Sequence, residues 1–98
     1  MTNGRKSMDN MTWQEFQEWQ RWDEFPERSN DPPLTVDPCF FYDGKEYYII
    51  EYYGKYHIFN DKWVSLFSHE NFLILLTTPI PLFHNKSFAD VCSELEFD

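Results

Sequence analysis

The fold is decided by residues 39–67, which read CFFYDGKEYYIIEYYGKYHIFNDKWVSLF. Three short turns are expected to divide this aromatic-rich segment, at Asp43-Gly44, Gly54-Lys55 and Asn60-Asp61. The Asp-Gly pair between two β-favouring runs is a strong hairpin signal, because glycine adopts positive φ at little steric cost. A further strand is expected over residues 63–67. The segment therefore predicts an antiparallel meander of three or four strands.

Alternation along these strands sorts the side chains onto two faces of the sheet. The first face is expected to carry Cys39, Phe41, Tyr48, Ile50, Tyr52, His57, Phe59, Val64 and Leu66. The second face is expected to carry Phe40, Tyr42, Tyr47, Ile49, Glu51, Tyr53, Tyr56, Ile58, Trp63 and Phe67. Neither set is polar, although an antiparallel sheet normally leaves a polar face to water. This sheet is therefore either covered on both faces or offers one face to a partner.

Three regions precede the meander. Residues 1–11 are polar and aperiodic, and we expect them to be disordered. An aromatic helix is expected over residues 12–25, because Thr12 and Glu15 have the spacing of a capping box and Pro26 ends the helix. Four prolines make residues 26–38 an extended connector, which either wraps the body of the protein or tethers a separate arm.

Two more helices are expected after the meander. Ser68 predicts the cap of a short helix over residues 69–76. Ser87 predicts the cap of the last helix, with Asp90 at its third position. The apolar residues of this last helix recur on one helical face, at Phe88, Val91, Cys92 and Leu95.

Together these elements predict a single α+β domain. It has a three- or four-stranded antiparallel meander, an N-terminal helix and two C-terminal helices, and residues 39–98 form its body. We expect the C-terminal helices to pack on one face of the sheet. The N-terminal helix would lie across the other face or project as an arm.

Composition excludes several classes of protein. Seventeen acids against 8 Lys and Arg give the 98 residues a net charge of −9, and duplex nucleic acid is not an expected ligand because Lys and Arg supply most of the affinity for phosphates. No apolar run reaches the roughly 18 residues of a membrane span, and no secretion leader is evident. We therefore expect a cytoplasmic protein, in a bacterium or in the host cell of a phage. Cys39 and Cys92 should stay reduced and buried there, and one long-range disulfide between them is the alternative.

No spacing in the sequence indicates an enzyme, a cofactor or a metal site. The serines lie in no Gly-x-Ser-x-Gly elbow, and the three glycines stand too far apart for a phosphate loop. His57, His69 and His84 lack the spacing of zinc ligands. We expect a non-enzymatic protein that binds no cofactor and no metal.

Aromatic and acidic side chains are the candidate binding residues. One aromatic residue recurs at every third position from Trp13 to Phe25, so the rings spiral around the helix. These rings either cover the sheet while partly exposed or serve as anchors for a partner. The acids concentrate in residues 12–27 (five acids and Arg21) and 87–98 (four acids, no base), where they serve solubility or attraction to a basic protein. The candidate partner-binding residues are Glu15, Glu18, Trp19, Trp22, Asp23, Tyr53, Glu94, Glu96 and Asp98.

The tyrosines and Trp63 of the second face could also stack the bases of a single nucleic-acid strand. Such binding needs a positive groove along the strand. Acids at the same turns cancel the charges of Lys45, Lys55 and Lys62. Direct nucleic-acid binding is therefore not expected.

Three segments of residues 40–98 carry a resemblance to a known group of proteins. They are Phe41-Tyr42-Asp43-Gly44-Lys45-Glu46-Tyr47, Ser68-His69-Glu70-Asn71-Phe72-Leu73 and Asn85-Lys86-Ser87-Phe88. Their order resembles that of small uncharacterised α+β proteins of phages and mobile elements of Gram-positive bacteria, some of which are anti-CRISPR inhibitors. The resemblance implies an acidic antagonist of a Cas nuclease that occludes a nucleic-acid groove, and it assigns no functional residue.

Two other functions fit the same sequence. An immunity protein or antitoxin would use the same acidic surface against a cognate toxin. A structural or assembly subunit would self-associate through its aromatic surface, so a homo-oligomer is also open.

Overall fold

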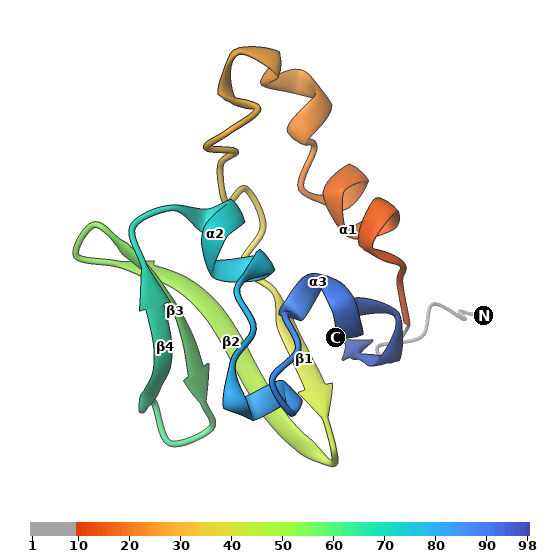
Figure 1. Ribbon diagram of the computed structural model, residues 1–98, viewed down its shortest axis with the longest axis vertical. Helices are drawn as coiled ribbons and strands as arrows, with labels where there is room; N and C mark the ends of the chain where they lie inside the picture. The colour runs from red at the N-terminus through yellow and green to blue at the C-terminus, as the bar shows by residue number, and fades with distance from the viewer. Residues whose placement is uncertain (1–9) are drawn as a thin grey trace.

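The computed structural model describes residues 10–98, and over this range the protein has the predicted α+β class with one five-stranded antiparallel sheet (Figure 1). Its strands are β1 (Cys39–Tyr42), β2 (Lys45–Tyr52), β3 (Lys55–Asn60), β4 (Ser65–His69) and β5 (Glu96–Phe97), in the order β4-β3-β2-β1-β5. Its α-helices are α1 (Trp13–Trp19), α2 (Phe72–Thr77) and α3 (Phe88–Val91). Short 3₁₀ turns are η1 (Trp22–Glu24), η2 (Pro26–Arg28), η3 (Pro81–Phe83) and η4 (Cys92–Glu94).

The expected disorder of residues 1–11 falls mostly on residues 1–9, which lie outside the described residues. Asn10 and Met11 are described and contact the body. The Asn10 side-chain amide donates to the Leu95 carbonyl at 2.6 Å, and Met11 packs against the core.

Both tight hairpins have two central residues at positive φ, the backbone pattern of a type I′ turn. Asp43 and Gly44 connect β1 to β2 at φ 54° and 79°, which confirms the first predicted turn. The second turn consists of Tyr53 and Gly54, at 52° and 78°, so its prediction at Gly54-Lys55 is wrong by one residue. This position puts both turn residues in the left-handed region, and the twist of a type I′ turn matches that of the flanking strands.

The turn after β3 is wider than predicted. The Asn60 side-chain oxygen accepts hydrogen bonds from the amides of Lys62 and Val64, at 2.9 and 3.0 Å. This contact extends the loop to residue 64, so β4 begins at Ser65 and the strand predicted over residues 63–67 is displaced. Ser68 consequently pairs with His57 inside the sheet and does not cap a helix.

Asn71 takes the capping role predicted for Ser68. Its side chain accepts from the Ile74 amide at 3.0 Å, and α2 begins at the next residue. The helix predicted over residues 69–76 is therefore shorter at its start, because the strand β4 extends to His69.

The capping box at Ser87 and Asp90 is confirmed, with both of its hydrogen bonds at 3.1 Å. The predicted apolar stripe is buried as well. The helix itself ends at Val91 and passes through η4 into the unpredicted strand β5, in which Phe97 pairs with Phe40. Burial of Phe97 in the core and pairing with β1 favour the strand over a longer helix.

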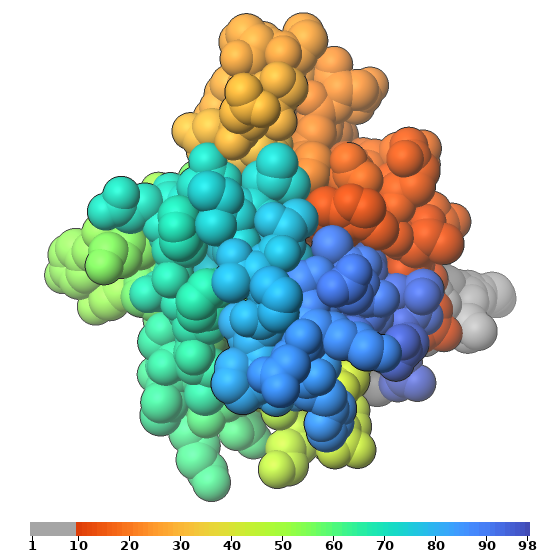
Figure 2. All heavy atoms as spheres, viewed as in Figure 1, coloured from red at the N-terminus to blue at the C-terminus, as the bar shows by residue number. Residues whose placement is uncertain are grey.

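The N-terminal helix lies on the same face of the sheet as α2 and α3, which overturns the expectation that it would cover the other face or project. Its Phe16 ring is fully buried, with centroids 6.5 Å from Phe72, 5.0 Å from Phe88 and 6.0 Å from Phe97. With six and four residues, α2 and α3 are too short to cover the sheet by themselves. Figure 2 shows segments from both ends of the chain side by side on this covered side.

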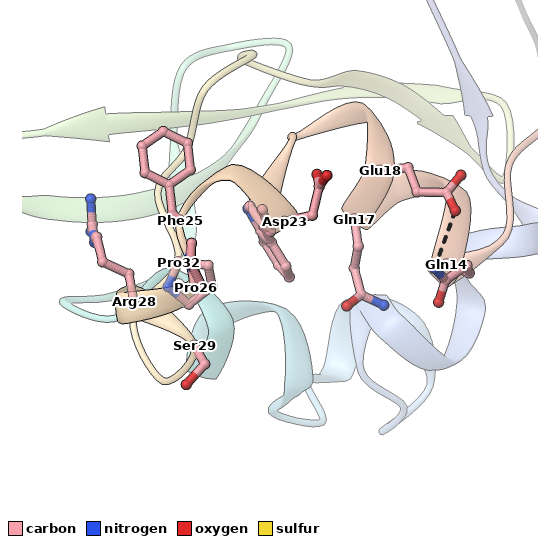
Figure 3. A pocket seen from close by; sticks show the side chains of 10 residues that line it. Gln14, Gln17, Glu18, Asp23, Phe25, Pro26, Arg28, Ser29 and Pro32 are labelled. Carbon is pink, nitrogen blue, oxygen red and sulfur yellow. Dashed lines mark hydrogen bonds between the residues drawn. The ribbon is translucent and has the colours of Figure 1, made fainter.

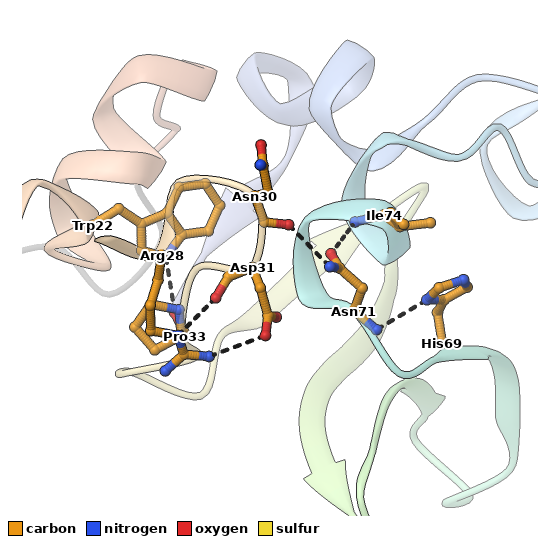
Figure 4. A network of polar contacts seen from close by, with 8 residues as sticks. All are labelled: Trp22, Arg28, Asn30, Asp31, Pro33, His69, Asn71 and Ile74. Atoms are coloured by element: carbon orange, nitrogen blue, oxygen red, sulfur yellow. Dashed lines mark hydrogen bonds and ion pairs between the residues drawn. The ribbon is translucent and has the colours of Figure 1, made fainter. Parts of the chain in front are cut away.

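The connector wraps the body. Gln20, fully buried after the end of α1, donates to the Val36 carbonyl at 2.7 Å and accepts from the Thr35 amide at 2.8 Å. Further along, the Trp22 indole donates to the Pro33 carbonyl at 2.8 Å (Figure 4). These contacts turn the chain after Trp19, so the helix predicted to reach residue 25 is shorter and continues as η1 and η2.

Candidate functional site

The two faces of the sheet differ completely in their cover. The second predicted face forms the floor of the core, where Phe40, Tyr47, Ile49, Tyr56 and Ile58 are buried beneath the helices. Within residues 10–98, no helix packs on the first predicted face. We call this uncovered side the open face.

A continuous row of rings lies along the open face, and we call it the aromatic ladder. Its members are Tyr48, Tyr52, Tyr53, His57, Phe59 and Trp63. Trp63 stacks on Tyr48 with centroids 4.7 Å apart and meets Phe59 at 5.9 Å. Tyr53 and Trp63 were both predicted on the second face. The wide Asn60 loop brings Trp63 to the open face instead, and the shifted β2–β3 turn places Tyr53 against Tyr52 on that face.

The other end of the aromatic ladder reaches the β2–β3 turn. Phe59 stacks on His57 at 5.1 Å, and the His57 ring meets Tyr52 at 6.1 Å and bonds the Ser65 hydroxyl at 2.8 Å. Tyr52 and Tyr53 close the row at 4.4 Å. The rings therefore support one another across β2 and β3 and the two turns that follow these strands.

Two rings of the aromatic ladder occupy backbone positions that aromatic residues rarely adopt. Tyr53 and Trp63 have φ values of 52° and 61°, while 88% and 59% of their surfaces are exposed. A left-handed backbone costs a residue with a Cβ roughly 1 kcal/mol, and exposed rings recover little by burial. Burial therefore returns little of this cost at Tyr53, whereas at Trp63 the stack on Tyr48 returns part of it.

Acidic groups meet the open face at its β1–β5 edge. The Cys39 thiol donates to the Glu46 carboxylate, with Sγ and Oε2 3.1 Å apart, and the Tyr48 phenol donates to the same carboxylate. Burial, then the bond to Glu46, raises the pKa of Cys39 to about 12. The bond to Glu46 is the main cause that raises the pKa of Tyr48 to about 12, and it lowers the pKa of Glu46. At neutral pH the thiol and the phenol keep their protons and Glu46 is charged.

Cys39, Glu46 and Asp98 are also the described residues that could hold a metal ion. Their ligand atoms all lie within 4.8 Å of one another. A metal bound there would have to displace the proton of the Cys39 thiol, whose pKa is raised to about 12. Cys39 and Cys92 are both free thiols, as predicted, although Cys39 is only half-buried.

The predicted partner-binding residues are distributed over three parts of the molecule. Glu15, Glu18 and Trp19 lie on α1, Trp22 and Asp23 on η1, Tyr53 in the β2–β3 turn, and Glu94, Glu96 and Asp98 along the C-terminal segment. The Trp19 ring contacts Phe97 at 5.9 Å, so the N-terminal and C-terminal acidic segments come together at one side. Trp19 and Trp22 are half-buried cover for the core, whereas Tyr53 belongs to the open face.

Sequence reasoning missed most of the aromatic ladder as a site. Alternation assigned Tyr48, Tyr52, His57 and Phe59 to one shared face, and the structure agrees. The missing information was which face the helices cover. That depends on long-range packing of rings such as Phe16, which local patterns do not specify.

No protein-family model, curated protein or solved structure matches this chain. Among residues 10–98, the longest α-helix has seven residues, so no helix there could cross a bilayer.

Proposed function

We propose that the protein is a non-enzymatic protein-binding module that uses its open face. The observation that carries the proposal is the aromatic ladder, an exposed row of mutually supported rings that no helix within residues 10–98 covers. Tyrosine and tryptophan are enriched among the residues that dominate binding energy at interfaces. Tyr53 and Trp63, the two most exposed rings of the aromatic ladder, are its anchors.

The charges beside the aromatic ladder favour a basic partner. Glu46, Glu96 and Asp98 lie toward the β1–β5 edge of the open face, while Lys45 and Lys62 line a hollow together with Glu46 and Lys55 begins β3. The chain carries a net charge of −9, which attracts a positively charged surface over a distance set by the salt concentration. A protein that handles nucleic acid offers such a surface.

The most specific form of this proposal is an inhibitor that occludes the nucleic-acid groove of a basic enzyme. A Cas nuclease is the leading target, in keeping with the resemblance to anti-CRISPR proteins. An immunity protein or antitoxin would use the same surface against a toxin. Rescue of a host cell that expresses a toxic neighbouring gene would identify the second form.

Two substitutions on the open face test the proposal without disturbing the core. Asparagine tolerates the left-handed backbone, so Tyr53→Asn with Trp63→Asn removes the anchors and relieves strain. The matched control is Ile74→Gln, which removes an exposed apolar side chain from α2 on the covered side. Each purified variant would be used to capture proteins from a lysate of the native host cell, with bound proteins identified by mass.

We expect the wild type and Ile74→Gln to retain the same basic protein, and the double variant to lose it. The association rate of that complex should fall steeply as salt rises. Equal retention by the double variant, or a rate independent of salt, would contradict the proposal. Self-association would be favoured instead if light scattering from the protein alone rose with concentration and this rise disappeared in the double variant. Binding of a single-stranded oligonucleotide would favour a nucleic-acid ligand.

A further inference from the structure

A second candidate site lies away from the sheet, in a pocket between α1 and the connector (Figure 3). Its volume is about 710 Å³, within the range of ligand-binding sites. Figure 3 shows Asp23 between Phe25 and Gln17, with the Glu18 carboxylate farther along α1 and turned toward Gln14. No residue that lines this pocket belongs to the open face.

The pocket presents two carboxylates that have spare acceptor capacity. Within residues 10–98, neither Glu18 nor Asp23 forms an ion pair, and Glu18 accepts one hydrogen bond from Gln14 at 3.2 Å. The cation at the pocket, Arg28, is already engaged, because its Nε donates to the Asp31 carbonyl at 2.8 Å and its guanidinium lies 3.6 Å from the Asp31 carboxylate (Figure 4). The pocket therefore favours a positively charged ligand.

Aromatic side chains form the apolar part of the same pocket. Trp22 and Phe25 both line it. The Trp22 ring is held in place by its hydrogen bond to Pro33 and by edge contacts with Phe16 and Phe72, at 6.2 and 5.9 Å. A fixed indole in the lining of a pocket that also holds carboxylates suits a guanidinium, which stacks on an aromatic face and donates to carboxylate oxygens.

We propose that this pocket binds an arginine side chain presented by another protein. The lysine ammonium is a compact point charge without a planar group. It cannot stack on the ring while donating to carboxylates in one plane, so lysine fits this pocket less well than arginine does. The pocket is larger than one side chain, which leaves room for the residues that flank the arginine in a peptide. This site is separate from the open face, and its failure would leave the proposed function of the open face untouched.

The test uses three blocked tripeptides that differ only in the central residue: Gly-Arg-Gly, Gly-Lys-Gly and Gly-citrulline-Gly. Each is titrated into the ¹⁵N-labelled full chain, and the indole N–H signal of Trp22, assigned with Trp22→Phe, is followed by NMR. We expect a saturable shift with the arginine peptide, binding about fivefold weaker with the lysine peptide, and no binding with neutral citrulline.

Charge-matched variants separate the pocket from general electrostatic attraction. Glu18→Gln with Asp23→Asn should abolish the shift, because both carboxylates are lost while both side chains are exposed and not needed for folding. Glu51→Gln with Glu94→Gln removes the same net charge at exposed positions outside the pocket and should leave the affinity unchanged. Equal affinity for arginine and lysine, equal loss in both double variants, or no saturable shift would each overturn the proposal.

Discussion

The two faces of one sheet show how the same strands can serve folding on one side and recognition on the other. On the covered face, Phe40, Ile49 and Ile58 are fully buried, and their rings and branched chains interlock with the helices. On the open face, Tyr52 and Trp63 remain more than half exposed. Both faces are apolar by sequence, so apolar alternation by itself does not distinguish a core from an interaction surface.

Side-chain chemistry distinguishes the faces better than hydrophobicity does. Tyrosine, tryptophan and histidine combine a large ring with a polar atom that stays in contact with water, which suits an exposed surface that also binds. Apart from Phe59, the aromatic ladder is built from these residues, whereas phenylalanine, isoleucine and leucine dominate the core. This difference predicts that equivalent substitutions on the two faces have very different costs.

The largest expected loss of stability comes from truncating the α1 ring that packs above the covered face. Phe16→Ala removes the ring that joins α1 to α2, α3 and β5, and we expect it to lower the free energy of unfolding by about 3–5 kcal/mol. Phe59→Ala, the matched change on the open face, should cost about 1 kcal/mol or less, since its ring is only partly buried. Urea unfolding measures both values. Similar costs for the two variants would show that the open face is covered in solution.

The next effect tests whether the connector is part of the covered side. Gln20→Leu puts an apolar side chain of similar size in the buried position and leaves the Thr35 amide and the Val36 carbonyl without their partner. We expect a loss of about 2–3 kcal/mol and faster proteolytic cleavage within residues 26–38. Glu27→Gln, at an exposed connector position, is the control and should change neither quantity. Unchanged proteolysis of Gln20→Leu would mean that the connector is held by other contacts.

A smaller effect of opposite sign is expected at the tip of the aromatic ladder. Tyr53→Asn should stabilise the protein by about 0.5–1 kcal/mol, because asparagine tolerates the left-handed backbone that the turn requires. Thermal unfolding measures the change, and Gly54→Ala, at φ 78°, should destabilise the same turn. If Tyr53→Asn lowered the melting temperature, the contact between Tyr52 and Tyr53 would be contributing to folding, and the argument that this ring serves binding would weaken.

Most features set by neighbouring residues were predictable from the sequence, apart from the wide Asn60 loop and the register of the Tyr53-Gly54 turn, whereas those set by distant contacts were not. The Asp43-Gly44 turn and the Ser87 capping box depend on neighbouring residues and were predicted correctly. The strand β5 has only two residues and exists because Phe97 pairs with Phe40 from the other half of the chain. A strand this short has no alternating pattern from which it could be predicted. Trp63 was assigned to the wrong face because the Asn60 side chain widens the preceding loop.

The smallest expected effect is a shift in the pKa of Tyr48, a ring of the aromatic ladder that lies beside the Glu46 carboxylate. Glu46→Gln removes the charge that holds the proton on Tyr48, so the pKa of Tyr48 should fall from about 12 toward its ordinary value near 10. Because folding raises this pKa, the protonated phenol stabilises the folded state fully below pH 10, and the contribution is lost as pH rises toward 12. Glu46 has the opposite sign: its lowered pKa gives a contribution that is lost as pH falls below its ordinary value.

Tyrosinate absorbance as a function of pH measures this shift directly. Tyr48→Phe serves as the control that identifies the step, since it removes the phenol and leaves Glu46 in place. One tyrosine should titrate at lower pH in Glu46→Gln than in the wild type, and that step should be missing in Tyr48→Phe. Identical titration curves for the wild type and Glu46→Gln would mean that the Tyr48 phenol does not donate to this carboxylate in solution. The aromatic ladder would then be decoupled from the acidic edge, and a partner could engage either one without the other.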